Sequence, residues 1–203
     1  MTEIWAPENK VRLERQLWLA VLKAQQELGI DVPDDAVSAY EAAADNVDLA
    51  SIAERERVTR HDVKARIEEF NALAGHEHIH KGMTSRDLTE NVEQLQIRQS
   101  LLLIRDKAVA TLARLAELAV QNDEVALTGR SHNVAAQMTT LGKRFATFTD
   151  ELLTAFDRLE SLLERYPLRG IKGPVGTSQD MLDLVGGGAA RLGEPEAKVA
   201  EPL

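Results

Sequence analysis

The sequence predicts an all-α protein. Through most of its 203 residues, apolar side chains recur at the three- and four-residue spacing of helices. No segment alternates apolar and polar residues convincingly, as a half-buried strand would. Two helical patterns, over residues 86–121 and 134–165, are unusually long. Together these observations predict a small N-terminal helical domain over residues 1–85, followed over residues 86–203 by the first two long helices of a helical bundle.

The sequence of the N-terminal domain predicts four helices, of which the first three are separated by short breaks. The first covers residues 7–28, because Pro7 suits a first helical turn and Gly29 suits a C-terminal stop. Shorter helices are expected over residues 34–44 and 49–55. These three helices cover the domain up to residue 55.

A fourth helix is expected over residues 59–74. Thr59 stands three residues before Asp62, which is typical of a capping box, and Gly75 ends the pattern. Apolar residues at helical spacing are expected to face the core, namely Val63, Ile67 and Phe70.

The two long patterns predict a bundle. The pattern over residues 86–121 contains no Gly or Pro, and at about 1.5 Å per residue it would be roughly 54 Å long. The second runs from Val134 to Arg165 and stops before Pro167. Two such helices cannot bury all their apolar faces alone, so we expect partner helices from other copies, in a homo-oligomer.

The composition excludes several classes of protein. The net charge is −9 and no basic stripe is present, which argues against nucleic-acid binding. There are no cysteines, so disulfides, thiol nucleophiles and cysteine-bound zinc are excluded. No apolar span is long enough for a membrane and no signal-peptide core is present, so we expect a cytoplasmic protein.

His132 is the first candidate functional residue. It follows Gly129, Arg130 and Ser131, just before the second long helical pattern. Imidazole titrates near neutral pH, so His132 could act as a proton donor from a rigid support. A lone histidine at the start of a helix is more often structural, and this segment alone decides nothing.

His76, His78 and His80 alternate along the chain, so an extended backbone would direct all three to one side. That spacing permits a zinc site with three imidazoles. No acidic group that would orient such ligands is evident, and no metal is expected. The better interpretation groups His80 with the segment that follows it.

Thr84 and Ser85 stand where the first long helix begins. With Asp87 they predict a capping box, and hydroxyls beside free N–H groups also form a site for a carboxylate or phosphate. The triplet Arg60, His61 and Asp62 stands at another helix start and adds a cation, although a solvated surface cluster is the simpler interpretation there. The glycine-rich loop over residues 170–177 lacks the Walker A ending, and its plainest interpretation is a connection between helices.

These segments together resemble the adenylosuccinate lyases of the fumarase/aspartase superfamily, in a form similar to those of actinobacteria. The resemblance runs from Ile4 to about Leu184. Its most specific parts are residues 60–65, 81–91, 129–132 and 170–177.

The resemblance implies a β-elimination that releases fumarate from adenylosuccinate and from the succinylated aminoimidazole carboxamide nucleotide (SAICAR) of purine synthesis, with no cofactor. His132 would be the general acid. The remaining matched residues would bind substrate: Arg60, His61 and Asp62 at the nucleotide, Thr84 and Ser85 at a carboxylate, and His80 as a further active-site histidine.

Two elements of the family have no counterpart in this sequence. The flexible loop that carries the serine base is missing, and so is the Arg-Tyr element that precedes the first helix. The resemblance therefore predicts an N-terminal piece of a homotetrameric enzyme, inactive by itself. Another lyase of the superfamily, such as argininosuccinate lyase, and a non-catalytic helical oligomerisation module are the alternatives.

Overall fold

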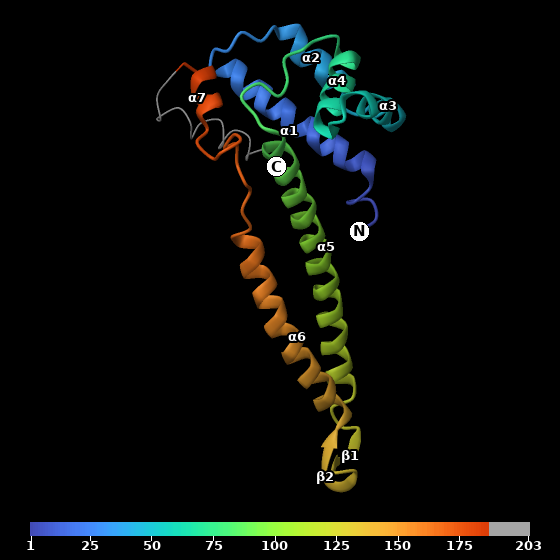
Figure 1. Cartoon of the computed structure of the whole chain (residues 1–203). Helices are drawn as coiled ribbons and strands as arrows, with labels where there is room; N and C mark the ends of the chain where they lie inside the picture. The colour runs from blue at the N-terminus through green and yellow to red at the C-terminus, as the bar shows by residue number, and fades with distance from the viewer. Residues whose placement is uncertain (187–203) are drawn as a thin grey trace. The chain divides into compact units, whose positions relative to one another are not determined.

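The computed structural model describes residues 1–186 and confirms a mostly helical fold (Figure 1). In chain order the elements are α1 (Pro7–Glu27), α2 (Asp34–Ala43), α3 (Leu49–Thr59), α4 (Asp62–Ala74), α5 (Ser85–Gln121), β1 (Ala126–Ser131), β2 (Val134–Thr140), α6 (Leu141–Glu164) and α7 (Gln179–Leu184). The described residues form two compact units, one of Met1–Ile97 with residues 167–186, the other of Arg98–Tyr166.

The first unit is built around α1, whose start and end agree with the prediction. Pro7 occupies the first turn, and Gly29 follows the helix with a φ of 87°. The buried face of α1 packs with residues from α2, α4 and the first turns of α5; the largest of this core are Leu17, Trp18, Leu22, Tyr40, Phe70 and Leu88. Because α5 begins inside this core, the compact units divide within α5, after Ile97.

The junction between α3 and α4 differs from the prediction. Helix α3 continues past Arg55 to Thr59, and Arg60 then adopts a left-handed conformation with a φ of 52°. His61 is the N-cap of α4, because its Nδ1 accepts a hydrogen bond from the Lys64 N–H at 3.4 Å. The predicted start at Thr59 is therefore wrong, since the left-handed residue separates the two helices.

The second unit contains a β-hairpin where the sequence predicted helix. Strands β1 and β2 are antiparallel, and the two residues that join them, His132 and Asn133, have φ values of 49° and 63°. Positive φ at both positions is the mark of a type I′ turn, which matches the twist of paired strands. The prediction of no strand is wrong here, and α6 begins at Leu141 instead of Val134.

Thr140 explains where α6 begins. Its side chain accepts a hydrogen bond from the Lys143 N–H at 3.1 Å, so it is the N-cap. Gly142 lies so close to the end of α5 that an added Cβ would stand 2.3 Å from the Ala119 carbonyl oxygen. Only glycine allows this approach between the two backbones.

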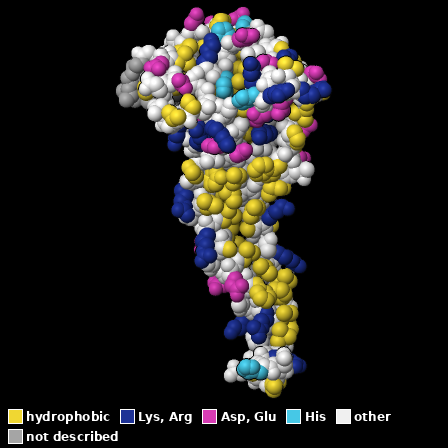
Figure 2. Space-filling model, in the orientation of Figure 1, with side chains coloured by type: hydrophobic (Ala, Val, Ile, Leu, Met, Phe, Trp, Pro, Cys, Tyr) yellow, Lys and Arg dark blue, Asp and Glu magenta, His cyan; other side chains and the backbone are white. Residues whose placement is uncertain are grey.

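Helices α5 and α6 run antiparallel in the second unit, as predicted (Figure 1). Hydrophobic side chains cover much of its visible face (Figure 2). Exposed apolar residues along these helices are Ile104, Val109 and Val120 on α5, and Phe148, Leu153 and Leu162 on α6. Within residues 1–186, none of the helices combines the length and the apolar character needed to cross a membrane.

Candidate functional site

Two of the predicted site segments meet where α4 and α5 begin. The Ser85 Oγ lies 3.5 Å from the His61 Nε2. Because the His61 Nδ1 accepts from the Lys64 N–H, the neutral ring carries its proton on Nε2, and Nε2 can donate to the serine. The His61 imidazole therefore joins the triplet of residues 60–62 to the Thr84-Ser85 segment.

Asp62 lies beside the same imidazole. One of its oxygens, Oδ1, lies 3.5 Å from the His61 Nδ1, and the other, Oδ2, accepts a hydrogen bond from Arg66 at 2.8 Å. Desolvation is the largest single influence on Asp62 and opposes its ionisation, but the hydrogen bonds from Arg66 and the Val63 N–H, together with the charges of Arg66 and His61, outweigh it and lower the pKa of this carboxyl. Asp62 is therefore a carboxylate at neutral pH.

Arg60 stands at the left-handed position before His61. Its side chain is exposed and makes no hydrogen bond or ion pair within the described part of the chain. Non-glycine residues adopt this conformation at a cost of roughly 1 kcal/mol or more, and such positions concentrate at functional sites. A cation is thus held next to the His61–Ser85 junction with its guanidinium unpaired.

His80 is held by Trp18. The Trp18 indole N–H donates to the His80 Nδ1 at 3.0 Å, so the neutral ring carries its proton on Nε2. Burial lowers the pKa of His80 to about 4, although Asp87 opposes this shift. His80 is therefore a neutral hydrogen-bond donor at physiological pH.

The three alternating histidines do not form a metal site. Among residues 1–186, no group of three His, Cys, Asp or Glu side chains is arranged to hold an ion. The His80 Nδ1 is occupied by the indole, and the His78 Nδ1 lies 3.2 Å from the Lys81 ammonium.

Thr84 and Asp87 form half of the predicted capping box. The Thr84 N–H donates to the Asp87 Oδ2 at 2.9 Å. The same buried carboxylate accepts from the N–H groups of Lys172 at 2.9 Å and of Gly173 at 3.1 Å, and it pairs with Arg169. Asp87 therefore joins the start of α5 to the glycine-rich loop.

Asn91 provides a second attachment one turn later. Its side chain accepts from the Gly170 N–H at 3.1 Å and donates to the Gly170 carbonyl at 3.0 Å. The sequence assigned no role to Asn91 or Arg169, and apart from the family resemblance it indicated only a connection between helices for this loop. The signal was available, because Asp87 and Asn91 are polar residues beside the buried apolar positions Leu88 and Val92.

His132 belongs to the second unit, and the other six predicted site residues belong to the first. Its side chain is exposed at the first position of the hairpin turn. The hairpin requires glycine at position 129 in β1. A Cβ there would stand 2.9 Å from the Gln137 carbonyl oxygen of the paired strand. The rigid support expected for His132 is thus a β-turn and not a helix start.

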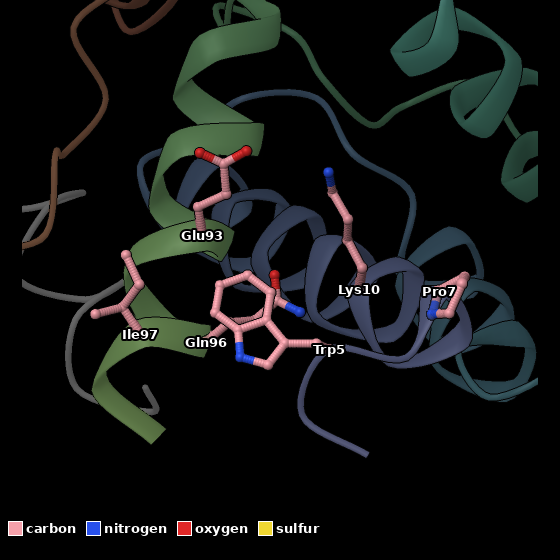
Figure 3. Close-up of a pocket in the computed structure, with 6 residues that line it drawn as sticks. All are labelled: Trp5, Pro7, Lys10, Glu93, Gln96 and Ile97. Atoms are coloured by element: carbon pink, nitrogen blue, oxygen red, sulfur yellow. The ribbon is translucent and has the colours of Figure 1, made fainter. Parts of the chain in front are cut away.

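A cavity of about 470 Å³ lies elsewhere in the first unit (Figure 3). Its lining comes from α1, α5 and the residues before α1: Trp5, Pro7, Lys10, Glu93, Gln96 and Ile97. None of the predicted site residues lines it. We therefore place the candidate site at the His61–Ser85 junction.

A family model described as lyase matches residues 3–181. The chain belongs to this lyase family. The match includes all seven predicted site residues, and it agrees with the fumarase/aspartase resemblance seen in the sequence.

Individual lyases show the same relationship. The chain is 34% identical to adenylosuccinate lyase of Caenorhabditis briggsae over 92% of its own length and 40% of the relative's. It is 36% identical to the enzyme of that name from Methanothermobacter thermautotrophicus, over 88% of this chain and 40% of the relative. The chain thus spans about 40% of the length of these relatives.

A solved structure supports the fold. The fumarate lyase of Mesorhizobium sp. BNC1 superposes with a TM-score of 0.84, covering 98% of this chain and 46% of that one, at 24% identity. At this identity the likeness shows a shared lyase fold.

Proposed function

We propose that this chain supplies part of the active site of an adenylosuccinate lyase. The reaction is the release of fumarate from adenylosuccinate, and likewise from SAICAR, in cytoplasmic purine nucleotide biosynthesis. The names of the curated relatives support this substrate. The single observation that carries the proposal is the contact between His61 and Ser85, which joins two matched segments at the starts of two helices.

The chemistry of these groups suits a substrate with several negative charges. N–H groups and hydroxyls at the start of α5 favour a carboxylate, and Thr84 and Ser85 would hold one there. Arg60, His61 and Asp62 would bind and orient the nucleotide. His80, a neutral donor, would add a hydrogen bond to the substrate without moving a proton.

The elimination itself needs an acid and a base. A base removes the proton from Cβ, the neighbouring carboxylate stabilises the carbanion, and an acid protonates the departing nitrogen. We assign the acid to His132. We assign the base to a residue outside these 203, because this sequence contains no counterpart of the family's serine loop.

We further propose that the site is completed by other copies of the protein. His132 lies in a different compact unit from the six binding residues. The exposed apolar residues of α5 and α6 favour packing against further helices, as in a tetrameric bundle.

The deciding experiment measures fumarate release by a full-length protein that contains this sequence. Adenylosuccinate and argininosuccinate are offered separately. Turnover of adenylosuccinate alone supports the proposal, turnover of argininosuccinate alone supports the other superfamily lyase, and no turnover of either supports a non-catalytic oligomerisation module. The isolated 203-residue chain is expected to release no measurable fumarate.

A further inference from the structure

The two oxygens of Asp62 face two different partners. Oδ1 lies 3.5 Å from the His61 Nδ1, whereas Oδ2 accepts from the Arg66 Nη2 at 2.8 Å. Asp62 is half-exposed, so its own packing does not fix the carboxylate. Arg66, one helical turn further along α4, determines which oxygen remains for the imidazole.

Arg66 is itself held by a charged residue of the core. Its Nε lies 2.6 Å from the Oε2 of Glu14, which is completely buried on α1. The guanidinium therefore uses one edge for Glu14 and another nitrogen for Asp62. The contact with Glu14 is an ion pair without normal hydrogen-bond geometry, since the Arg66 Nε and both Glu14 oxygens make no hydrogen bond; with the hydrogen bond to Asp62 it places the guanidinium between two carboxyl groups.

Stability alone does not explain why Glu14 is buried beside Arg66. Burial raises its pKa to about 7 despite the nearby Arg66 and Lys10, and Asp62 adds to the rise. Both of its oxygens are buried, and neither makes a hydrogen bond of normal geometry. A buried ion pair of this kind is often no more stabilising than apolar residues of similar size, so holding the Arg66 guanidinium against the core is the better explanation.

We infer that Glu14 and Arg66 are positioning residues for His61: Glu14 fixes Arg66, Arg66 fixes Asp62, and Asp62 presents Oδ1 to the imidazole. The inference deepens the proposed function and rests on His61 belonging to that site. In the neutral ring, Nδ1 accepts from the Lys64 N–H. When the ring takes up a proton beside a bound anion, Oδ1 of Asp62 is placed to receive the new Nδ1–H, so the ring keeps its orientation.

The first test observes the His61 ring directly. In the isotope-labelled 203-residue chain, ring signals are assigned by their loss in His61→Gln, and the ring-proton contact to the Ser85 β-protons is measured. We expect Asp62→Asn, Arg66→Gln and Glu14→Gln each to weaken this contact at least twofold. The matched control is Glu68→Gln, which removes a charge of the same helix that pairs with Lys64, and it should change nothing.

The amide spectrum of each variant shows whether it folds. Asp62 is half-exposed, so Asp62→Asn is expected to fold. It keeps the test decisive even if a substitution at the buried Glu14 unfolds the chain. An unchanged ring contact in folded Asp62→Asn or in folded Arg66→Gln would overturn the inference.

The second test is a double-mutant cycle in the full-length protein. Arg66→Gln should lower kcat severalfold in the wild-type background and have no further effect in the Asp62→Asn background. Equal losses in both backgrounds would mean a merely structural role and would refute the inference. If the wild-type protein has no lyase activity, the proposed function fails, and the ring measurement still decides the positioning role.

Discussion

The Asp87 carboxylate, in the first turn of α5, accepts a hydrogen bond from the Gly173 N–H, 86 residues later in the chain. This contact fixes the glycine-rich loop beside Thr84, whose N–H binds the same carboxylate. One buried side chain thus organises two of the four segments that carry the family resemblance.

Asp87→Ala should therefore destabilise the first unit severely. It leaves the N–H groups of Lys172 and Gly173 without their acceptor and removes one partner of Arg169, for an expected loss of about 3–5 kcal/mol. Urea unfolding measures the loss, and amide exchange at Lys172 and Gly173 locates it. Asp183→Ala, at an exposed position on α7, is the control and should cost at most about 0.5 kcal/mol.

Glu14 and His80 should give opposing pH dependences of stability. Glu14 has a pKa of about 7 in the folded chain against an ordinary 4.5, so the folded state binds the extra proton between these values and stability falls as pH rises. His80 has a pKa of about 4 against 6.5, so the unfolded state binds the extra proton and stability rises with pH.

The two effects cancel in the wild-type chain between pH 4.5 and 6.5, where the windows overlap. Relative to wild type, Glu14→Gln should make the free energy of unfolding rise with pH by up to about 1.4 kcal/mol per unit, and His80→Gln should make it fall. Denaturant unfolding at several pH values measures both slopes. Parallel curves for the two variants and wild type would contradict the prediction.

Self-association is expected through α5 and α6. Val109 is 50% exposed and Phe148 is 57% exposed, on helices that the sequence predicts to pack against further helices. Sedimentation should show association of the 203-residue chain at micromolar concentration, weakened at least tenfold in Val109→Glu/Phe148→Glu. Val58→Glu changes an even more exposed apolar residue on α3 and should leave association intact; a wild-type monomer would refute the prediction.

The first helix could be predicted because its ends are encoded locally. Pro7 and Gly29 mark the ends of α1, and both signals act through the backbone conformation of one residue. The hairpin could not be found in this way, because His-Asn is a weaker turn signal than Asn-Gly and the apolar residues around it also suit a helix. Its left-handed pair, His132 and Asn133, is stabilised by strand pairing that the local pattern does not reveal.

The candidate site was likewise predictable from the sequence only in part. The sequence singled out His61 and Ser85 separately, but only the fold brings their side chains to 3.5 Å across 24 residues. Glu14 and Arg66 gave no signal, since a charged residue in an amphipathic helix is ordinarily expected to be solvated. Their role depends on burial, which is a property of the tertiary structure.

The last prediction separates the imidazole of His132 from the turn that carries it. In the full-length protein, His132→Gln should lower kcat by about 10²–10⁴-fold, because it removes the proposed proton donor while a polar side chain of similar size remains. Thr84→Ala should instead raise KM more than it lowers kcat, since its proposed role is to hold an anion. Asn133→Gly is the matched control: glycine accepts the φ of 63° at that position, so the turn persists and kcat should stay near wild type. A His132→Gln enzyme with nearly normal kcat would remove His132 from the role of acid, and a large loss in Asn133→Gly would show that the hairpin's shape, and not the imidazole alone, is required for turnover.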